Sequence, residues 1–192
     1  MNFLNYQFLK LQAVTLLVFG QREAALVRFD AMLALAPGNR YAMASRAHLL
    51  GQLGDKQAAV AALQELAQAF PDNSAAWFNL GYMLDELGRH VEAEPAFRRA
   101  LDAEPKMDRA WYGLALVLIK ERRFEEAVEA LEINTKLQPM SPFGWYQLAR
   151  VHVDRQEPDE AVKIIRHLKG FEPKVAAQLE RETGLLVGEL GK

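Results

Sequence analysis

A repeat period of 34 residues is the feature that most constrains how this chain can fold. The three tryptophans are spaced by this interval, and each is followed three residues later by a leucine. One proline per period recurs at the same spacing, at Pro37, Pro71, Pro105, Pro139 and Pro173. A period of roughly 20 to 50 residues is typical of chains built from stacked copies of one supersecondary unit. The period therefore has to be explained before any local structure.

Two further sets of residues at this spacing indicate that the unit is a pair of helices. One position is alanine in every repeat, at Ala25, Ala59, Ala93, Ala127 and Ala161. Another is large and apolar, at Phe29, Leu63, Phe97, Leu131 and Ile165. Trp77, Leu80, Gly81 and Leu84 follow the i, i+3, i+4, i+7 spacing of one helix face. A glycine in that stripe lets a neighbouring helix approach closely.

These residues are the ones by which the sequence resembles the tetratricopeptide repeat family, whose pattern runs tryptophan, leucine-glycine, tyrosine, alanine, phenylalanine and proline over about 34 residues. The resemblance covers residues 6 to 175. Gln12 and Arg46 depart from it at the leucine position. The tyrosine position holds Leu16, Leu50, Leu84, Leu118 and His152. The resemblance implies an all-α, right-handed α-solenoid of five helix-turn-helix repeats.

We expect residues 1–175 to form these five tandem repeats and residues 176–192 to form a C-terminal capping helix. The expected repeats span about 6–39, 40–73, 74–107, 108–141 and 142–175. Pro95 falls inside the expected second helix of the third repeat, where proline predicts a kinked or late-starting helix. The alternative is a bend that adjusts the curvature of a binding surface.

Composition excludes several other classes of protein. The formal net charge is -2, with both signs spread along the chain, so no electrostatic feature favours nucleic acid as a partner. No cysteine is present, which excludes thiol catalysis and thiolate metal sites and suits the cytoplasm. Polar residues such as Asn5 and Lys10 interrupt the apolar N-terminus before it reaches the length of a membrane span. We therefore expect no targeting segment and no membrane insertion.

Catalysis has no support in the sequence. The four histidines lie in different repeats without an H-x-x-x-H pair, so we expect no metal site. No glycine-rich phosphate loop follows a strand, and no nucleophile-elbow motif is present. We expect neither catalytic residues nor a cofactor.

The first helix of each repeat offers the positions at which a partner would bind. Residues displaced from the packing stripe are expected to line the concave surface, and many of them are aromatic or basic, as at interface centres. The predicted groove residues are Tyr41, His48, Phe78, Asn79, Tyr82, Arg109, Tyr112, Phe143, Tyr146 and Arg150. They predict a groove for an apolar or aromatic-containing segment with an acidic residue near Arg109 or Arg150. The alternative is that these rings pack against neighbouring repeats or the C-terminal helix.

The N-terminal helix is unusually apolar for a terminal repeat, which should turn a polar face to water. We expect self-association through this repeat, giving a homodimer, with a partner subunit or the protein's own tail as the alternatives. The residues assigned to self-association are Phe3, Phe8, Leu11, Val18 and Phe19.

The sequence therefore predicts a protein-interaction scaffold or adaptor that binds a partner segment in its groove. A chaperone that shields an apolar or exported client would use the same groove differently. A structural subunit of a multiprotein assembly would bury the apolar first helix.

Overall fold

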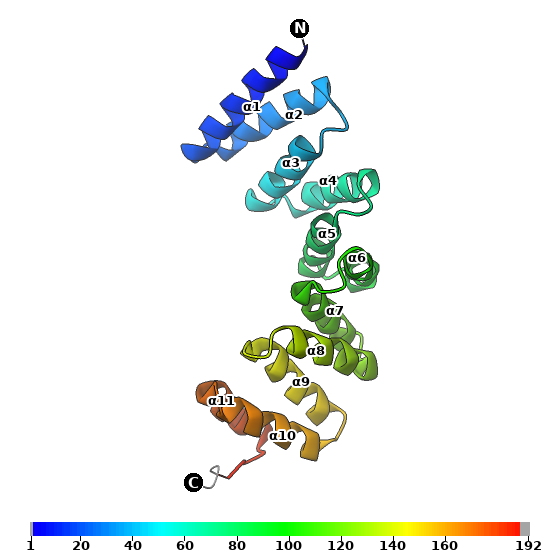
Figure 1. Cartoon of the computed structure of the whole chain (residues 1–192), viewed down its shortest axis with the longest axis vertical. Helices are drawn as coiled ribbons and strands as arrows, with labels where there is room; N and C mark the ends of the chain where they lie inside the picture. The colour runs from blue at the N-terminus through cyan, green and yellow to red at the C-terminus, as the bar shows by residue number, and fades with distance from the viewer. Residues whose placement is uncertain (1, 189–192) are drawn as a thin grey trace. The chain divides into compact units, whose positions relative to one another are not determined.

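The computed structural model describes residues 2–188, which form eleven helices and no strand (Figure 1). The helices are α1 (Asn2–Val18), α2 (Arg22–Leu35), α3 (Arg40–Gln52), α4 (Lys56–Ala69), α5 (Ser74–Glu86), α6 (His90–Ala103), α7 (Asp108–Lys120), α8 (Phe124–Leu137), α9 (Pro142–Asp154), α10 (Pro158–Lys169) and α11 (Pro173–Thr183). The predicted all-α repeat architecture is confirmed.

The chain divides into two compact units, Met1–Glu104 and Pro105–Lys192, which we call the N-terminal and C-terminal units. In the N-terminal unit each helix from α1 to α6 packs on the next. In the C-terminal unit α7 to α11 pack in the same successive way, and α11 also packs on α9. Stacking on its neighbours thus buries the apolar surface that each helix pair cannot bury alone.

Within a pair, the two helices meet where a small side chain faces a large one. Ala13 and Phe29 are fully buried in one cluster in the first pair. In the third pair a Cβ built on Gly81 would come within 2.9 Å of the Phe97 ring. The sequence predicted that Gly81 lets a neighbouring helix approach closely, and the Phe97 ring of α6 takes the space that a side chain at position 81 would need.

Between pairs, a second set of small residues lets the first helix of one pair sit against the second helix of the preceding pair. These buried positions are Ala42 and Ala76 in the N-terminal unit and Gly144 in the C-terminal unit, which share one place in the 34-residue repeat. Ala76 packs with Leu66 and Ala67 of α4. A Cβ on Gly144 would lie 2.2 Å from the Asn134 side-chain oxygen on α8. A side chain at position 144 would therefore require Asn134 to move.

The tryptophan and proline of the repeat pattern are joined by a hydrogen bond. The indole N–H groups of Trp77 and Trp111 donate to the carbonyl oxygens of Pro71 and Pro105 at 2.9 Å, and Trp145 donates to Pro139 at 2.8 Å. Each bond fastens the connection that enters a pair to the helix it precedes. The ring can then pack on its apolar face while its polar atom is satisfied.

The turn inside each pair repeats one left-handed residue. Gly20, Gly54 and Gly88 have φ between 71° and 84°, and Arg122 and Gln156 occupy the same position with φ of 61° and 62°. Each residue lies in a Schellman-type helix end, in which the N–H of the following residue binds the carbonyl five residues back, as in Asp55 to Leu50 at 3.0 Å. Side chains disfavour this conformation, so the last two turns are strained.

Two features differ from the sequence-based expectation. α6 begins at His90, the same repeat position as Lys56 in α4, so the late start predicted from Pro95 is wrong. The carbonyl of Val91, four residues before Pro95, loses its helical partner, but Val91 is 78% exposed and water can bind there.

The last helix also differs from the expected capping helix over 176–192. It starts at Pro173, because proline suits the first helical turn, and it ends at Thr183, because Gly184 adopts a left-handed conformation with φ of 72°. Residues 184–188 are not helical, and the Leu186 side chain is exposed. Residues 189–192 of the expected helix lie outside the described part of the chain.

The strained turns give a test of the repeat geometry. Gln156→Gly should stabilise the protein by roughly 0.5–1 kcal/mol, because glycine removes the left-handed penalty but adds backbone entropy to the unfolded chain. The measurement is the urea midpoint of unfolding, with Gly88→Gln expected to lower it. A lower midpoint for Gln156→Gly would show that the turn is not strained.

Candidate partner-binding groove

An open groove in the N-terminal unit is lined by α3, α4, α5 and the residue that precedes α5. Its volume is about 500 Å³. The buried side chains of Ala47, Leu63 and Leu66 form its floor. Three of the predicted groove residues, His48, Asn79 and Tyr82, are exposed along its sides. The structure therefore brings these three residues together on one surface.

The groove combines polar side chains with an apolar floor. The amides of Gln52 and Asn79 each offer both a donor and an acceptor, and His48 and Tyr82 add ring surface with polar atoms. Arg40 lies at one end of α3, where its guanidinium stacks 5.6 Å from the centre of the Phe70 ring. The lining, which belongs wholly to the described residues, includes no acidic side chain. The side chains that line the groove thus carry no negative charge, and Arg40 carries a positive one.

Two other predicted groove residues of the N-terminal unit point elsewhere. The Tyr41 ring packs edge-on against Phe29 at 5.8 Å, with the Lys10 ammonium 4.8 Å from its centroid. Phe78 is half-buried, and its ring lies 6.0 Å from that of Phe97 on α6. Phe78 therefore packs between helices, which was the alternative for the whole set, whereas Tyr41 contacts its neighbours but stays 41% exposed.

The lining residues that the sequence prediction missed include Arg40, Gln52, Asn73 and Met83. Arg40 and Gln52 continue the four-residue spacing of Ala44 and His48 along α3, so extending that series in both directions would have found them. Asn73 is also the N-cap of α5 and accepts a hydrogen bond from the Ala76 amide at 3.3 Å.

In the C-terminal unit the predicted residues have different surroundings. Tyr112 is half-buried against the apolar cluster of that unit. Arg109 and Phe143 are exposed on α7 and α9, and 68% of Phe143 is accessible. The predicted site therefore does not form one uniform surface from these side chains.

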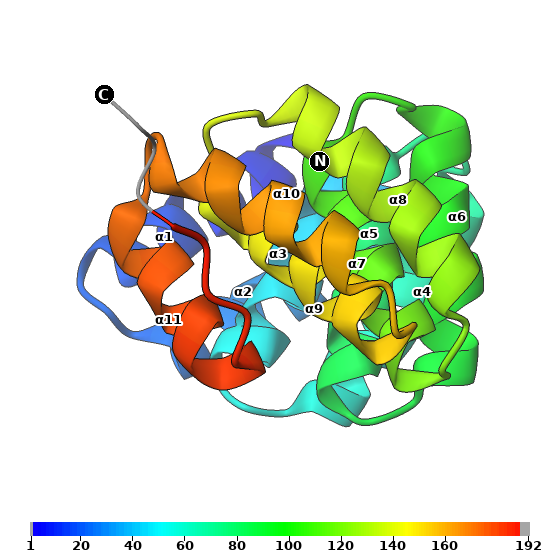
Figure 2. The ribbon, with the colours of Figure 1, turned by 90° about the horizontal axis from the view of Figure 1, so that it is seen from below.

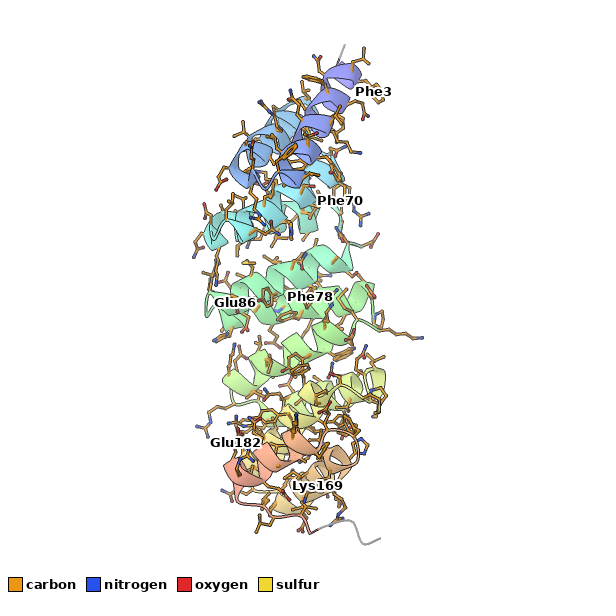
Figure 3. All side chains as sticks on the ribbon, turned by 90° about the vertical axis from the view of Figure 1, so that its left-hand side faces the viewer. Phe3, Phe70, Phe78, Glu86, Lys169 and Glu182 are labelled. Atoms are coloured by element: carbon orange, nitrogen blue, oxygen red, sulfur yellow. The ribbon has the colours of Figure 1, made fainter. Side chains whose placement is uncertain are left out.

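Tyr146 and Arg150 contact the last helix of their own chain. The Tyr146 hydroxyl donates to the Glu182 carboxylate on α11 at 2.6 Å, and the Arg150 guanidinium lies 3.3 Å from that hydroxyl and 4.0 Å from the carboxylate. The acidic residue predicted near Arg150 in a bound partner is thus supplied by α11. Figure 3 labels Glu182 on this helix.

A second set of contacts holds α11 and the residues after it. The Lys169 ammonium at the end of α10 pairs with Glu180 at 2.8 Å and donates to the Val187 carbonyl. Glu180 also accepts from the Val187 amide at 2.8 Å, and the Val187 side chain is buried. Figure 2 shows the segment after Gly184 lying across α11. The segment that carries Val187 is therefore held against α10 and α11 within the C-terminal unit.

These contacts lower the pKa values of both carboxyl groups. The hydrogen bond from Tyr146 is the main cause for Glu182, followed by that from Gln178. For Glu180 the main cause is Lys169, followed by the Val187 amide. Because each contact favours the ionised carboxylate, the contribution of these contacts to the docking of α11 is complete above the ordinary carboxyl pKa and is lost as the pH falls through the lowered values.

The five residues assigned to self-association are exposed. Phe3, Phe8, Leu11, Val18 and Phe19 are between 61% and 77% accessible. Figure 3 places Phe3 near the start of α1. The apolar side chains that make the N-terminal helix unusual in the sequence are thus exposed on its surface.

Other kinds of site were also sought among residues 2–188. No group of three His, Asp or Glu side chains in this range is placed to hold a metal ion. Within the same range no helix is both long enough and apolar enough to cross a membrane. The His152 imidazole lies 2.8 Å from the Glu157 carboxylate across the turn that follows α9.

The sequence matches family models for known repeats. One tetratricopeptide repeat model matches residues 44–108 and 112–173, and a second matches residues 84–139. A search of curated proteins by sequence gives no match.

Solved structures of the same fold align with nearly the whole chain. A crystal structure of MamA protein has a TM-score of 0.82 at 17% identity, covering 96% of this chain and 98% of that one. MamA from Desulfovibrio magneticus has a TM-score of 0.78 at 21% identity, covering 93% and 96%. YrrB, described as a tetratricopeptide protein with an unusual peptide-binding site, has a TM-score of 0.78 at 18% identity, covering 88% of both chains. At these identities the likeness concerns the fold.

The α11 contacts can be tested by substituting both carboxyl groups. Glu180→Gln with Glu182→Gln should speed amide hydrogen exchange over residues 173–187 at neutral pH, because the charge-assisted bonds are lost. At a pH well below the ordinary carboxyl range the variant and the wild type should exchange alike, since both are then uncharged. The control is Glu129→Gln on α8. Equal exchange at neutral pH would mean that these bonds do not hold α11.

Proposed function

Because the chain belongs to the tetratricopeptide repeat family, we propose that it is an adaptor whose N-terminal unit binds an extended segment of a partner protein. One observation carries the proposal: His48, Asn79 and Tyr82 are exposed along an apolar floor in a groove lined only by α3, α4, α5 and Asn73. Of the other rings predicted for this unit, Phe78 packs against Phe97 and Tyr41 contacts Phe29 and Lys10, which supports this groove as the proposed binding surface.

The lining determines what kind of segment fits. An extended backbone presents N–H and C=O groups in alternation, and the amides of Gln52 and Asn79 can pair with both. An apolar side chain of the ligand would rest on Leu63 and Leu66. An acidic side chain would pair with Arg40, since the lining described here contains no competing carboxylate. The ligand class is therefore an extended peptide with apolar and acidic residues.

The groove also sets the length of the ligand. Its lining follows the 13 residues of α3 from Arg40 to Gln52. At about 1.5 Å per helical residue, this is a track of roughly 20 Å. A strand-like segment covers about 3.3 Å per residue, so roughly six residues would fill the track. This proposed length suits recognition of a short linear motif.

The peptide-binding site named for YrrB supports a peptide ligand by analogy of fold. The chaperone alternative would use the same groove but release its client. We place the activity in the cytoplasm, as the absence of cysteine suggests. An adaptor should keep a stable complex with its folded partner, whereas a chaperone should suppress aggregation of a client and then release it.

The test is selection of binders from a displayed library of random 12-residue peptides, followed by affinity measurement. Asn79→Ala with Tyr82→Ala should weaken the selected peptides by roughly 10- to 100-fold, as expected for two residues at an interface centre. Gln68→Ala, on an exposed position of α4 outside the lining, should leave the affinity unchanged.

Peptides selected by the wild type should be enriched in apolar and acidic residues. Arg40→Gln should reduce the preference for the acidic ones without abolishing binding. Equal affinity for the wild type and the Asn79, Tyr82 double variant would contradict the groove as the binding site.

A further inference from the structure

The outer face of α1 carries an apolar stripe made of Leu4, Phe8, Leu11 and Val18, and Phe19 continues it just past the helix end. Thr15 lies in the stripe between Leu11 and Val18. Its five apolar side chains are 61% to 77% exposed. By helical periodicity they lie opposite the face that is packed through Leu9 and Ala13. Phe3 falls outside this stripe and borders a hollow beside the end of α2.

The repeat pattern does not require these apolar residues. The repeat position of Phe8 holds alanine in the next two repeats, at Ala42 and Ala76. The position of Leu11 holds polar or small residues in the later repeats, and that of Val18 holds charged or amide side chains. The corresponding residues in the later repeats are Ser45, Asn79, Gly113 and Gln147 for Leu11, and Gln52, Glu86, Lys120 and Asp154 for Val18. The stripe is therefore specific to the first repeat.

A further stacked repeat cannot cover this face in the usual way. The position of Phe8 is the one at which Ala42 and Ala76 admit the second helix of a preceding pair. At the same position in α9, even a Cβ on Gly144 would meet Asn134 at 2.2 Å. A phenylalanine ring occupies the space that such a helix needs. The face thus requires a different occupant.

The stripe has the spacing of a helix-pairing seam. Leu4, Phe8, Leu11, Thr15 and Val18 alternate steps of four and three residues, the 3.5-residue period at which two helices pack side by side. α1 is also longer than the other first helices, with 17 residues against 13 in α3, α5, α7 and α9. Its extra N-terminal turn carries Leu4 and extends the seam.

The stripe is an exposed apolar patch of the kind that marks an interface. Its two phenylalanine rings, at about 200 Å² each and exposed to 61% and 73%, present roughly 270 Å², and Leu4, Leu11 and Val18 add to this area. Apolar patches larger than a few hundred Å² mark interaction sites, and a standard interface buries about 800 Å² per partner with its polar rim included. A shallow hollow beside Phe8, lined also by Ala31, Ala34 and Leu35, continues the apolar surface onto α2.

Charge favours a second copy over a charged partner. Lys10 is the single charged residue of α1, and it is turned away over the Tyr41 ring. An interface without charges has no electrostatic means to choose a different partner. A straight apolar seam can pair with itself about a twofold axis, with Phe8 of each copy against Leu11 of the other.

From these observations we infer that the chain forms a homodimer in which the α1 stripes of two copies pack on each other. This inference does not depend on the groove proposal, because none of the stripe residues lines the groove between α3 and α5.

The test uses two double variants of opposite charge, Phe8→Lys with Leu11→Lys, and Phe8→Glu with Leu11→Glu. Light scattering after gel filtration at about 100 µM should give the wild type twice the chain mass of 21.6 kDa. Each variant alone should be a monomer, with dimerisation weakened at least roughly a hundredfold. An equimolar mixture of the two variants should recover the dimer mass. Both positions are exposed, so circular dichroism should show unchanged helix content.

The matched control is Val27→Lys with Val91→Lys, two exposed apolar positions outside the stripe, which should leave the dimer intact. A monomeric wild type would overturn the inference, and a monomer that sediments with phosphatidylcholine vesicles would assign the stripe to lipid instead. A dimer that persists in both charged variants, or a mixture that stays monomeric, would overturn the pairing of stripe with stripe.

Discussion

Close approach of adjacent helices at small buried side chains is the constraint on which the remaining structure depends. Gly81 against Phe97 fixes the distance within a pair, and Gly144 against Asn134 fixes it between pairs. Because small residues recur at these positions from the second repeat on, the first helices within each unit present their remaining faces in a similar way. The groove beside α3 and α5 and the free outer face of α1 both follow from that packing.

The same repeat produces different surfaces in different places. In the N-terminal unit, α3 and α5 leave His48, Asn79 and Tyr82 exposed along a groove. In the C-terminal unit, α11 packs on α9 and places Glu182 on Tyr146 and Arg150. The exposed polar residues suit a partner segment, whereas the second set is already paired within the chain. Sequence differences at a few exposed positions, and not the fold, therefore decide where a ligand could bind.

Much of the fold could be predicted because its determinants are local and periodic. The tryptophan, proline and small-residue positions predicted the helix pairs, and the structure confirms them. The left-handed turns at Arg122 and Gln156 were missed because neither residue is typical of that conformation, although Gly20, Gly54 and Gly88 mark the same position. The site was harder to predict, since the directions of Tyr41 and Phe78 and the docking of Glu182 depend on tertiary packing.

Binding of a partner segment in the groove of the N-terminal unit between α3 and α5 can be measured directly. The measurement is amide chemical-shift mapping by NMR during titration with a peptide selected for binding. We expect shift changes concentrated in residues 40–52 and 73–83, with residues 142–154 unchanged. Changes centred on 142–154, or on α1, would contradict it.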